Sequence, residues 1–116
     1  MYFKQKIGKN GEEMAKQYLI NKEYKIIQTN FRCYFGEIDI IAQKDNSLIF
    51  VEVKARTNQK YGLPAQSITQ QKKKHIRKTI EYYLLCKKIR NVLIQIDVIE
   101  IYLEKGEINH IKNINL

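Results

Sequence analysis

Cysteine, histidine and long hydrophobic runs are scarce in this sequence. It has two cysteines, Cys33 and Cys86, and two histidines among 116 residues. Neither cysteine belongs to a CxxC motif, which argues against a structural zinc site. No apolar run reaches the ~18 residues that a transmembrane helix needs, and residues 1–10 lack the apolar stretch of a signal peptide. We therefore expect a cytoplasmic protein with reduced thiols and no membrane partner.

Acidic side chains are outnumbered by basic ones. The chain has 21 lysines and arginines against 12 aspartates and glutamates, which gives a net charge of +9. Such a charge favours a polyanionic partner, most simply nucleic acid. An alternative stays open, because 17 of the basic residues are lysines and the chain has 19 isoleucines. AT-rich coding DNA produces the same bias without any ligand.

The apolar pattern predicts one α/β domain spanning residues 1–116, with a mixed central sheet flanked by helices in the order α-β-β-β-α-β. A first helix is expected to begin at Asn10 as N-cap, and a second to run from Ser67 to about Lys88. Residues 30–32 are expected to lead into a loop. Strands are expected at residues 24–28, 36–43, 47–55 and 92–103, with a further edge strand within residues 107–116.

The second and third strands form a predicted hairpin with its turn at residues 45–46. In this register Asp39 faces Glu52 and Glu37 faces Lys54, with Cβ atoms ~4.5–5.5 Å apart. Period-two alternation gathers these four charged side chains at one end of one face. The opposite face is predicted to be wholly apolar and to contain Ile38, Ile40, Ala42, Ile49, Val51 and Val53.

Three carboxylates this close repel one another unless a proton or a cation lies between them. Mg²⁺ or Mn²⁺ with carboxylate ligands would remove the repulsion, polarise a phosphodiester and help to form hydroxide. Lys54 would hold the water or stabilise the phosphate charge, and Glu12 on the first helix would complete the site. The alternative is a partly buried ion network in which Glu37 pairs with Lys54.

Basic residues of the second helix offer a route to nucleic acid. Lys72 lies within the apolar stripe, so its amine either reaches past the core to water or points at the carboxylates. Lys73 and Arg77 belong either to a solvated face or to a track for the phosphate backbone. The loop that starts at Arg56 is a further candidate for phosphate contacts. In that loop Tyr61 either packs locally or stacks on an unpaired base.

Five blocks of the sequence resemble the YraN-like family of uncharacterised bacterial proteins, over nearly the whole chain. They are GKNGEEMA at residues 8–15, NFR at 30–32, GEIDIIA at 36–42, FVEVKAR at 50–56 and IDV at 96–98. That family resembles the PD-(D/E)xK nuclease superfamily, close to archaeal Holliday-junction resolvases. The resemblance implies a restriction-endonuclease-like αβββαβ core and Mg²⁺-dependent cleavage of DNA, including branched or repair intermediates.

The resemblance also implies roles for individual residues. It assigns Asp39, Glu52 and the Val53 carbonyl to the metal, Lys54 to the attacking water, and Glu12 to a second metal or the water shell. Lys72 matches a basic position of the family. Resolvase-like nucleases often act as dimers, so a homodimer stays open.

Two departures from the family pattern limit the resemblance. Ile38 replaces the superfamily proline before the aspartate, and Gln95-Ile96 replaces an Arg-Phe pair before Asp97. Asp97 is therefore expected to be structural, and Glu37 has no assigned role.

We expect a metal-dependent DNA nuclease that uses Mg²⁺ or Mn²⁺. Its candidate catalytic residues are Asp39, Glu52, Lys54 and Glu12. Its candidate nucleic-acid contacts are Lys72, Lys73, Arg56 and Arg77. Two alternatives remain, a non-catalytic nucleic-acid-binding module that retains the fold and a small basic adaptor for a protein or ribosomal partner.

Overall fold

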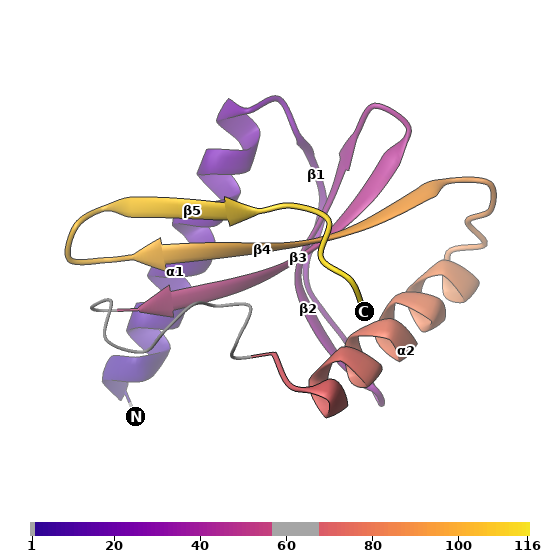
Figure 1. The fold of residues 1–116 in the computed structure, drawn as a ribbon, viewed down its shortest axis with the longest axis horizontal. Helices are drawn as coiled ribbons and strands as arrows, with labels where there is room; N and C mark the ends of the chain where they lie inside the picture. The colour runs from indigo at the N-terminus through magenta and orange to yellow at the C-terminus, as the bar shows by residue number, and fades with distance from the viewer. Residues whose placement is uncertain (1, 57–67) are drawn as a thin grey trace.

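The computed structural model describes residues 2–56 and 68–116, which form one five-stranded sheet and two helices (Figure 1). The strand order is β1-β2-β3-β4-β5, with β3 parallel to β4 and the other neighbours antiparallel. The predicted mixed α/β sheet is confirmed, and β5 extends it as the expected edge strand. The elements are α1 Tyr2–Asn21, β1 Lys25–Cys33, β2 Gly36–Lys44, β3 Ser47–Arg56, α2 Gln70–Cys86, β4 Leu93–Tyr102 and β5 Glu107–Ile111.

The two helices cover opposite faces of the sheet, and each has its own core (Figure 1). On one face Ala15 and Leu19 of α1 pack among buried residues of β2, β3 and β4. On the other face Ile76, Ile80 and Tyr83 of α2 do the same. A central strand covered on both sides is apolar throughout, and β3 keeps this character until Glu52. Charged side chains therefore collect where β3 leaves the core.

Both helices begin elsewhere than the sequence pattern predicted. α1 begins at Tyr2, so Asn10 is an interior residue; a capping signature is a local preference that neighbouring helix-forming residues override. α2 begins at Gln70, and the Thr69 hydroxyl caps it by accepting a hydrogen bond from the Lys72 backbone N–H at 3.1 Å. The predicted cap Ser67 lies outside the described residues. Within the described ranges neither helix is long and apolar enough to cross a membrane.

β1 continues where a loop was predicted. Residues 30–32 lie within β1, and the turn to β2 is formed by the pair Tyr34-Phe35, because Cys33 pairs with Gly36. Polar residues such as those at positions 28–30 favour a turn over a strand when they are considered alone. Pairing with β2 overrides that preference.

A break in the pleat lies opposite Asp39. The β1–β2 register is unbroken from Thr29–Ile40 to Phe31–Ile38, and its shift lies earlier, between Ile26 and Gln28. Asn30, however, has a φ of 52°. Ile40 packs under α1 and Ile38 packs under α2. The prediction that both isoleucines share one face is therefore wrong, since a left-handed residue on the neighbouring strand interrupts the alternation.

The β2–β3 hairpin has the predicted turn, where Asp45 adopts a φ of 54°. The predicted register holds from Lys44–Ser47 to Ile40–Val51. Beyond that pair the two strands diverge (Figure 1). The expected facing pairs Asp39–Glu52 and Glu37–Lys54 lie past the end of the ladder, in the opening between the strands.

Candidate functional site

An open cleft of about 360 Å³ lies where β2 and β3 diverge. The start of β2, the end of β3 and the N-terminal part of α2 line it. Its lining residues are Gly36, Glu37, Asp39, Glu52, Val53, Lys54, Lys72, His75 and Ile76. The structure thus brings most of the residues singled out in the sequence to one place.

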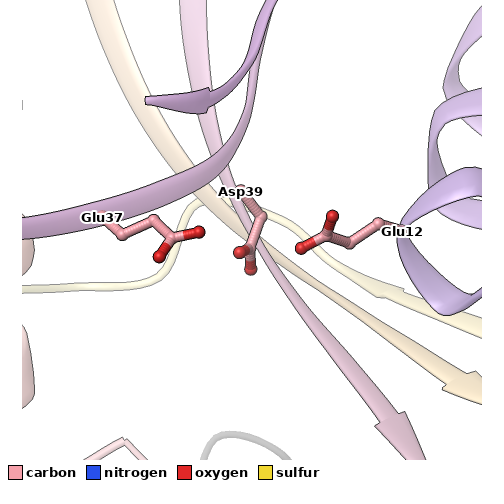
Figure 2. Close-up of side chains that lie close together, drawn as sticks. All are labelled: Glu12, Glu37 and Asp39. Carbon is pink, nitrogen blue, oxygen red and sulfur yellow. The ribbon is translucent and has the colours of Figure 1, made fainter. Parts of the chain in front are cut away.

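Glu12, Glu37 and Asp39 form a group of three carboxylates. One oxygen from each lies within 4.8 Å of the other two. Figure 2 shows Glu12 reaching from α1 and Glu37 from β2, with Asp39 between them. Gly11 permits this approach, because a Cβ at Gly11 would lie 2.6 Å from the Cβ of Ala55 in β3. The glycine before Glu12 therefore lets α1 come close enough to deliver that carboxylate.

Asp39 bridges the opening between the strands. Its Oδ2 accepts a hydrogen bond from the Val53 backbone N–H at 2.8 Å. Burial raises the pKa of Asp39 to about 7, and the Glu52 carboxylate contributes to the rise. The charges of Glu12 and Glu37 also contribute to this rise in pKa, and the Val53 hydrogen bond opposes it. The ionised form of Asp39 is therefore unfavourable here unless a cation lies beside it.

Glu52 is buried, and Lys72 lies against it. Lys72 Nζ is 3.3 Å from Glu52 Oε2. The amine of Lys72 thus points at the carboxylates, as one of the two interpretations of the sequence required. Burial raises the pKa of Glu52, although the charges of Lys72 and Lys54 oppose the rise.

The two lysines also act on each other. The pKa of Lys54 is lowered to about 8, mainly by burial and also by its contact with Lys72. Burial acts to lower the pKa of Lys72, but its contacts with Lys54 and Glu52 outweigh burial and leave that pKa above its usual value. Lys54 is therefore the lysine that gives up its proton more readily.

The donor set suits a hard divalent cation. Glu12, Glu37 and Asp39 offer only carboxylate oxygens, the ligands that Mg²⁺ and Mn²⁺ prefer. One oxygen of each carboxylate lies within 4.8 Å of the other two, so these three side chains would hold a single ion between them. The resemblance assigned the metal to Asp39 and Glu52, and both ligand sets share Asp39.

Arg32 and His75 were missed as site residues. Arg32 Nε lies 3.2 Å from Glu37 Oε2, which gives Glu37 a partner on the neighbouring strand. Arg32 belongs to the NFR block, so its presence in a motif was the available signal. His75 lines the cleft from α2, and nothing in the sequence distinguishes it from the other polar residues of that helix.

The remaining predicted DNA contacts lie around the cleft or along α2. Lys73 is half-buried and Arg77 is exposed. Arg56 ends β3, and its Nε is buried without a hydrogen-bond partner among the residues that the structure describes. Tyr61 lies outside the described residues. Contacts of these side chains with DNA remain predictions.

Asp97 lies in a separate buried network. Its carboxylate accepts hydrogen bonds from Gln95 Nε2 at 3.0 Å and from the Asn113 backbone N–H at 2.9 Å, and it lies 2.7 Å from His110 Nε2. His110 Nδ1 is 3.1 Å from the Tyr18 hydroxyl. The network ties α1 to β4 and β5, which is the structural role expected for Asp97. Gln95, at a departure from the family pattern, supplies one of its bonds.

The chain matches a family model and curated relatives of nearly its own length. The model of the uncharacterised protein family UPF0102 matches residues 11–101. A UPF0102 protein of Caldicellulosiruptor saccharolyticus is 41% identical over 114 residues, which cover 95% of this chain and 97% of the relative. UPF0102 proteins of Clostridioides difficile and Persephonella marina are 45% and 42% identical over 106 residues, covering 91% of this chain and 93% and 90% of the relatives. The matched range contains every residue that lines the cleft.

Proposed function

We propose that this chain, which belongs to the uncharacterised protein family UPF0102, is a metal-dependent nuclease that hydrolyses phosphodiester bonds of DNA. The observation that carries the proposal is the convergence of Glu12, Glu37 and Asp39 beside a cleft that also holds Glu52 and Lys54. The names of the relatives state no activity. The proposal therefore rests on the chemistry of these side chains and on the resemblance of their motifs to PD-(D/E)xK nucleases.

Each side chain has a role that its position supports. Asp39, together with Glu12 and Glu37 or with Glu52, would hold Mg²⁺ or Mn²⁺. The bound ion would polarise the phosphodiester and lower the pKa of a coordinated water. Lys54 would orient that water or stabilise the charge that develops on the phosphate. Lys72 would hold Glu52 in place through their contact.

Charge supports DNA as the substrate. The chain carries a net charge of +9, and Lys73 and Arg77 lie on the helix that lines the cleft. Cations of this kind bind the phosphate backbone without reading its sequence. The proposal therefore includes duplex and branched DNA.

Cleavage of labelled DNA tests the proposal. Linear duplex and a four-way junction are incubated with the protein in Mg²⁺, Mn²⁺ or EDTA. We expect cleavage with either metal and none with EDTA, and we expect Asp39→Asn to lower the rate by at least ~100-fold. Asp45→Asn removes the same charge at the β2–β3 turn and should leave the rate unchanged. Cleavage that persists in Asp39→Asn contradicts the proposal.

A non-catalytic nucleic-acid-binding module is the second candidate, and the Lys72–Glu52 contact favours it. In that case a lysine, rather than a metal, compensates the carboxylate. The module would bind DNA with strong salt dependence, with the same affinity in EDTA and in Mg²⁺, and would leave every substrate intact. The cleavage assay separates the two candidates.

A further inference from the structure

Four aromatic side chains form a row of ring contacts at the β1–β2 turn, which we term the aromatic platform. Tyr34 and Phe35 form the turn, and their ring centroids are 5.5 Å apart. Phe35 lies 6.2 Å from Tyr82 of α2, and Tyr82 lies 6.4 Å from Phe31 of β1. The platform is thus built from β1, the β1–β2 turn and α2.

The platform is fixed at one end and open at the other. Phe31 packs edge-on against the buried ring of Tyr83, with centroids 5.1 Å apart. At the open end Tyr34 is 96% exposed, and Tyr82 is 42% exposed. Aromatic rings fixed on the core side and open to solvent are suited to stacking with a planar ligand.

The turn residues depart from local preference. Two-residue hairpin turns favour Asn, Asp and Gly, as at the β2–β3 turn of this chain. Here both positions are aromatic, and the exposed Tyr34 ring contributes little to the core. Departures from local preference concentrate at functional positions. The choice of residues therefore points to a bound partner.

Positive charge flanks the aromatic platform. Lys78 Nζ lies 5.6 Å from the centroid of Phe35. The Arg32 side chain is 74% exposed and reaches Glu37 in the carboxylate group. An apolar protein surface would gain little from these cations, whereas a nucleic acid strand offers planar bases with phosphates beside them. Charge complementarity therefore favours nucleic acid.

The platform adjoins the cleft along the chain and across the fold. Gly36 and Glu37 follow the turn directly and line the cleft. Phe35 and Glu37 are two residues apart, which is about 7 Å of extended chain and about two 3.4 Å base steps of a DNA strand. Gly36 also lets α2 pack closely, because a Cβ there would lie 3.1 Å from Thr79 Oγ1. The rings therefore lie next to the cleft that holds the carboxylates.

We propose that the aromatic platform stacks on unpaired bases of a DNA strand whose backbone enters the carboxylate cleft. This inference rests on the proposed function, and it narrows the substrate class to DNA with a single-stranded segment or an open junction. Stacking of this kind tolerates any base sequence. Tyr34 acts as the outermost contact and Tyr82 as the inner one.

Binding without cleavage tests the inference. Fluorescence anisotropy is measured in EDTA with a labelled oligothymidine strand and with a blunt duplex. We expect Tyr34→Ala to weaken binding of the single strand about tenfold and to leave duplex binding within about twofold. Tyr34→Phe keeps the ring and should restore wild-type affinity. Leu93→Ala is the control, because it also removes a large exposed side chain. Leu93 pairs with Ser47 at the start of β3, whereas the cleft is lined by the end of β3.

The outcomes separate this inference from the proposed function. Three results would contradict the proposal that the aromatic platform stacks on bases. Tyr34→Ala could lose affinity equally for both DNAs, it could lose none for the single strand, or the wild-type protein could bind neither DNA. If the protein cleaves duplex DNA despite such a result, the proposed nuclease function still holds. Conversely, Tyr34→Ala could lose affinity for the single strand alone while the wild-type protein cleaves no DNA. That result would support base stacking on the platform and contradict the proposed nuclease function.

Discussion

At Asp39 the fold holds a carboxyl group where its ionised form is unfavourable. The side chain lies between Glu12 and Glu37 and accepts a hydrogen bond from the Val53 N–H. Burial and the neighbouring carboxylates raise its pKa to about 7. In the absence of metal this residue therefore works against folding at neutral pH, and a divalent cation would remove that cost.

The pH dependence of stability follows from this shift. An unperturbed aspartate has a pKa of 3.8, so the folded protein holds the Asp39 proton more tightly than the unfolded chain does. The free energy of unfolding should therefore fall as pH rises from about 4 to about 7, with Asp39 contributing on the order of 4 kcal/mol. Urea unfolding in EDTA measures it. Asp39→Asn should lose this decline and exceed wild type in stability above about pH 7; identical pH profiles would contradict the account.

Glu12 and Glu13 provide a matched pair on one helix. Glu12 faces Asp39, whereas Glu13 is exposed and its Oε1 accepts a hydrogen bond from Gln17 Nε2 at 3.4 Å. Glu12→Gln should weaken Mn²⁺ binding by at least ~10-fold, because it removes one charged ligand. Glu13→Gln should leave the affinity unchanged. Electron paramagnetic resonance of free Mn²⁺ measures both, and equal affinities in the two variants would remove Glu12 from the site.

At the scale of elements, the features set by neighbouring residues were predictable and those set by packing were not. The β2–β3 turn and its register follow from turn chemistry and alternation, and they placed Asp39, Glu52 and Lys54 together correctly. The break at Asn30, which separates Ile38 from Ile40, depends on a backbone conformation that composition does not reveal. The divergence of the strands past Ile40–Val51 likewise had no local signal.

The position of α1 depends on Gly11. Gly11→Ala should push α1 away from β3 and destabilise the protein by about 1–3 kcal/mol, despite the ~1 kcal/mol that alanine gains in helix propensity. In the double variant, Ala55→Gly removes the Cβ of Ala55, which would otherwise lie 2.6 Å from the new Cβ at position 11. A double-mutant cycle measured by chemical denaturation should give a coupling of about 1 kcal/mol or more. Additive effects would show that the helix does not depend on this contact.

For the molecule as a whole, the net charge and the position of the cleft both favour binding of DNA. Both faces of the sheet are covered by helices, and the cleft opens where the central strands part. The aromatic platform lies beside this cleft, and the whole chain carries a net charge of +9. A cytoplasmic location and a homodimer remain predictions.

Salt dependence tests whether that charge binds DNA. The logarithm of the affinity should fall linearly with the logarithm of the salt concentration. Arg77→Gln should lower the slope by about 0.9 on duplex DNA, as expected for the loss of one phosphate contact. Arg90→Gln, an exposed arginine beyond the C-terminal end of α2, is the control. Equal slopes in wild type and Arg77→Gln would exclude Arg77 from the DNA interface.

Calorimetric titration of Mn²⁺ into the protein tests the central claim most directly. It compares wild type with Asp39→Asn and with the charge-matched Asp45→Asn. The carboxylate site predicts that wild type and Asp45→Asn bind the ion with the same affinity, and that Asp39→Asn loses the binding heat. If all three proteins bind Mn²⁺ equally, or if none binds it, the carboxylates of Glu12, Glu37 and Asp39 are not a metal site.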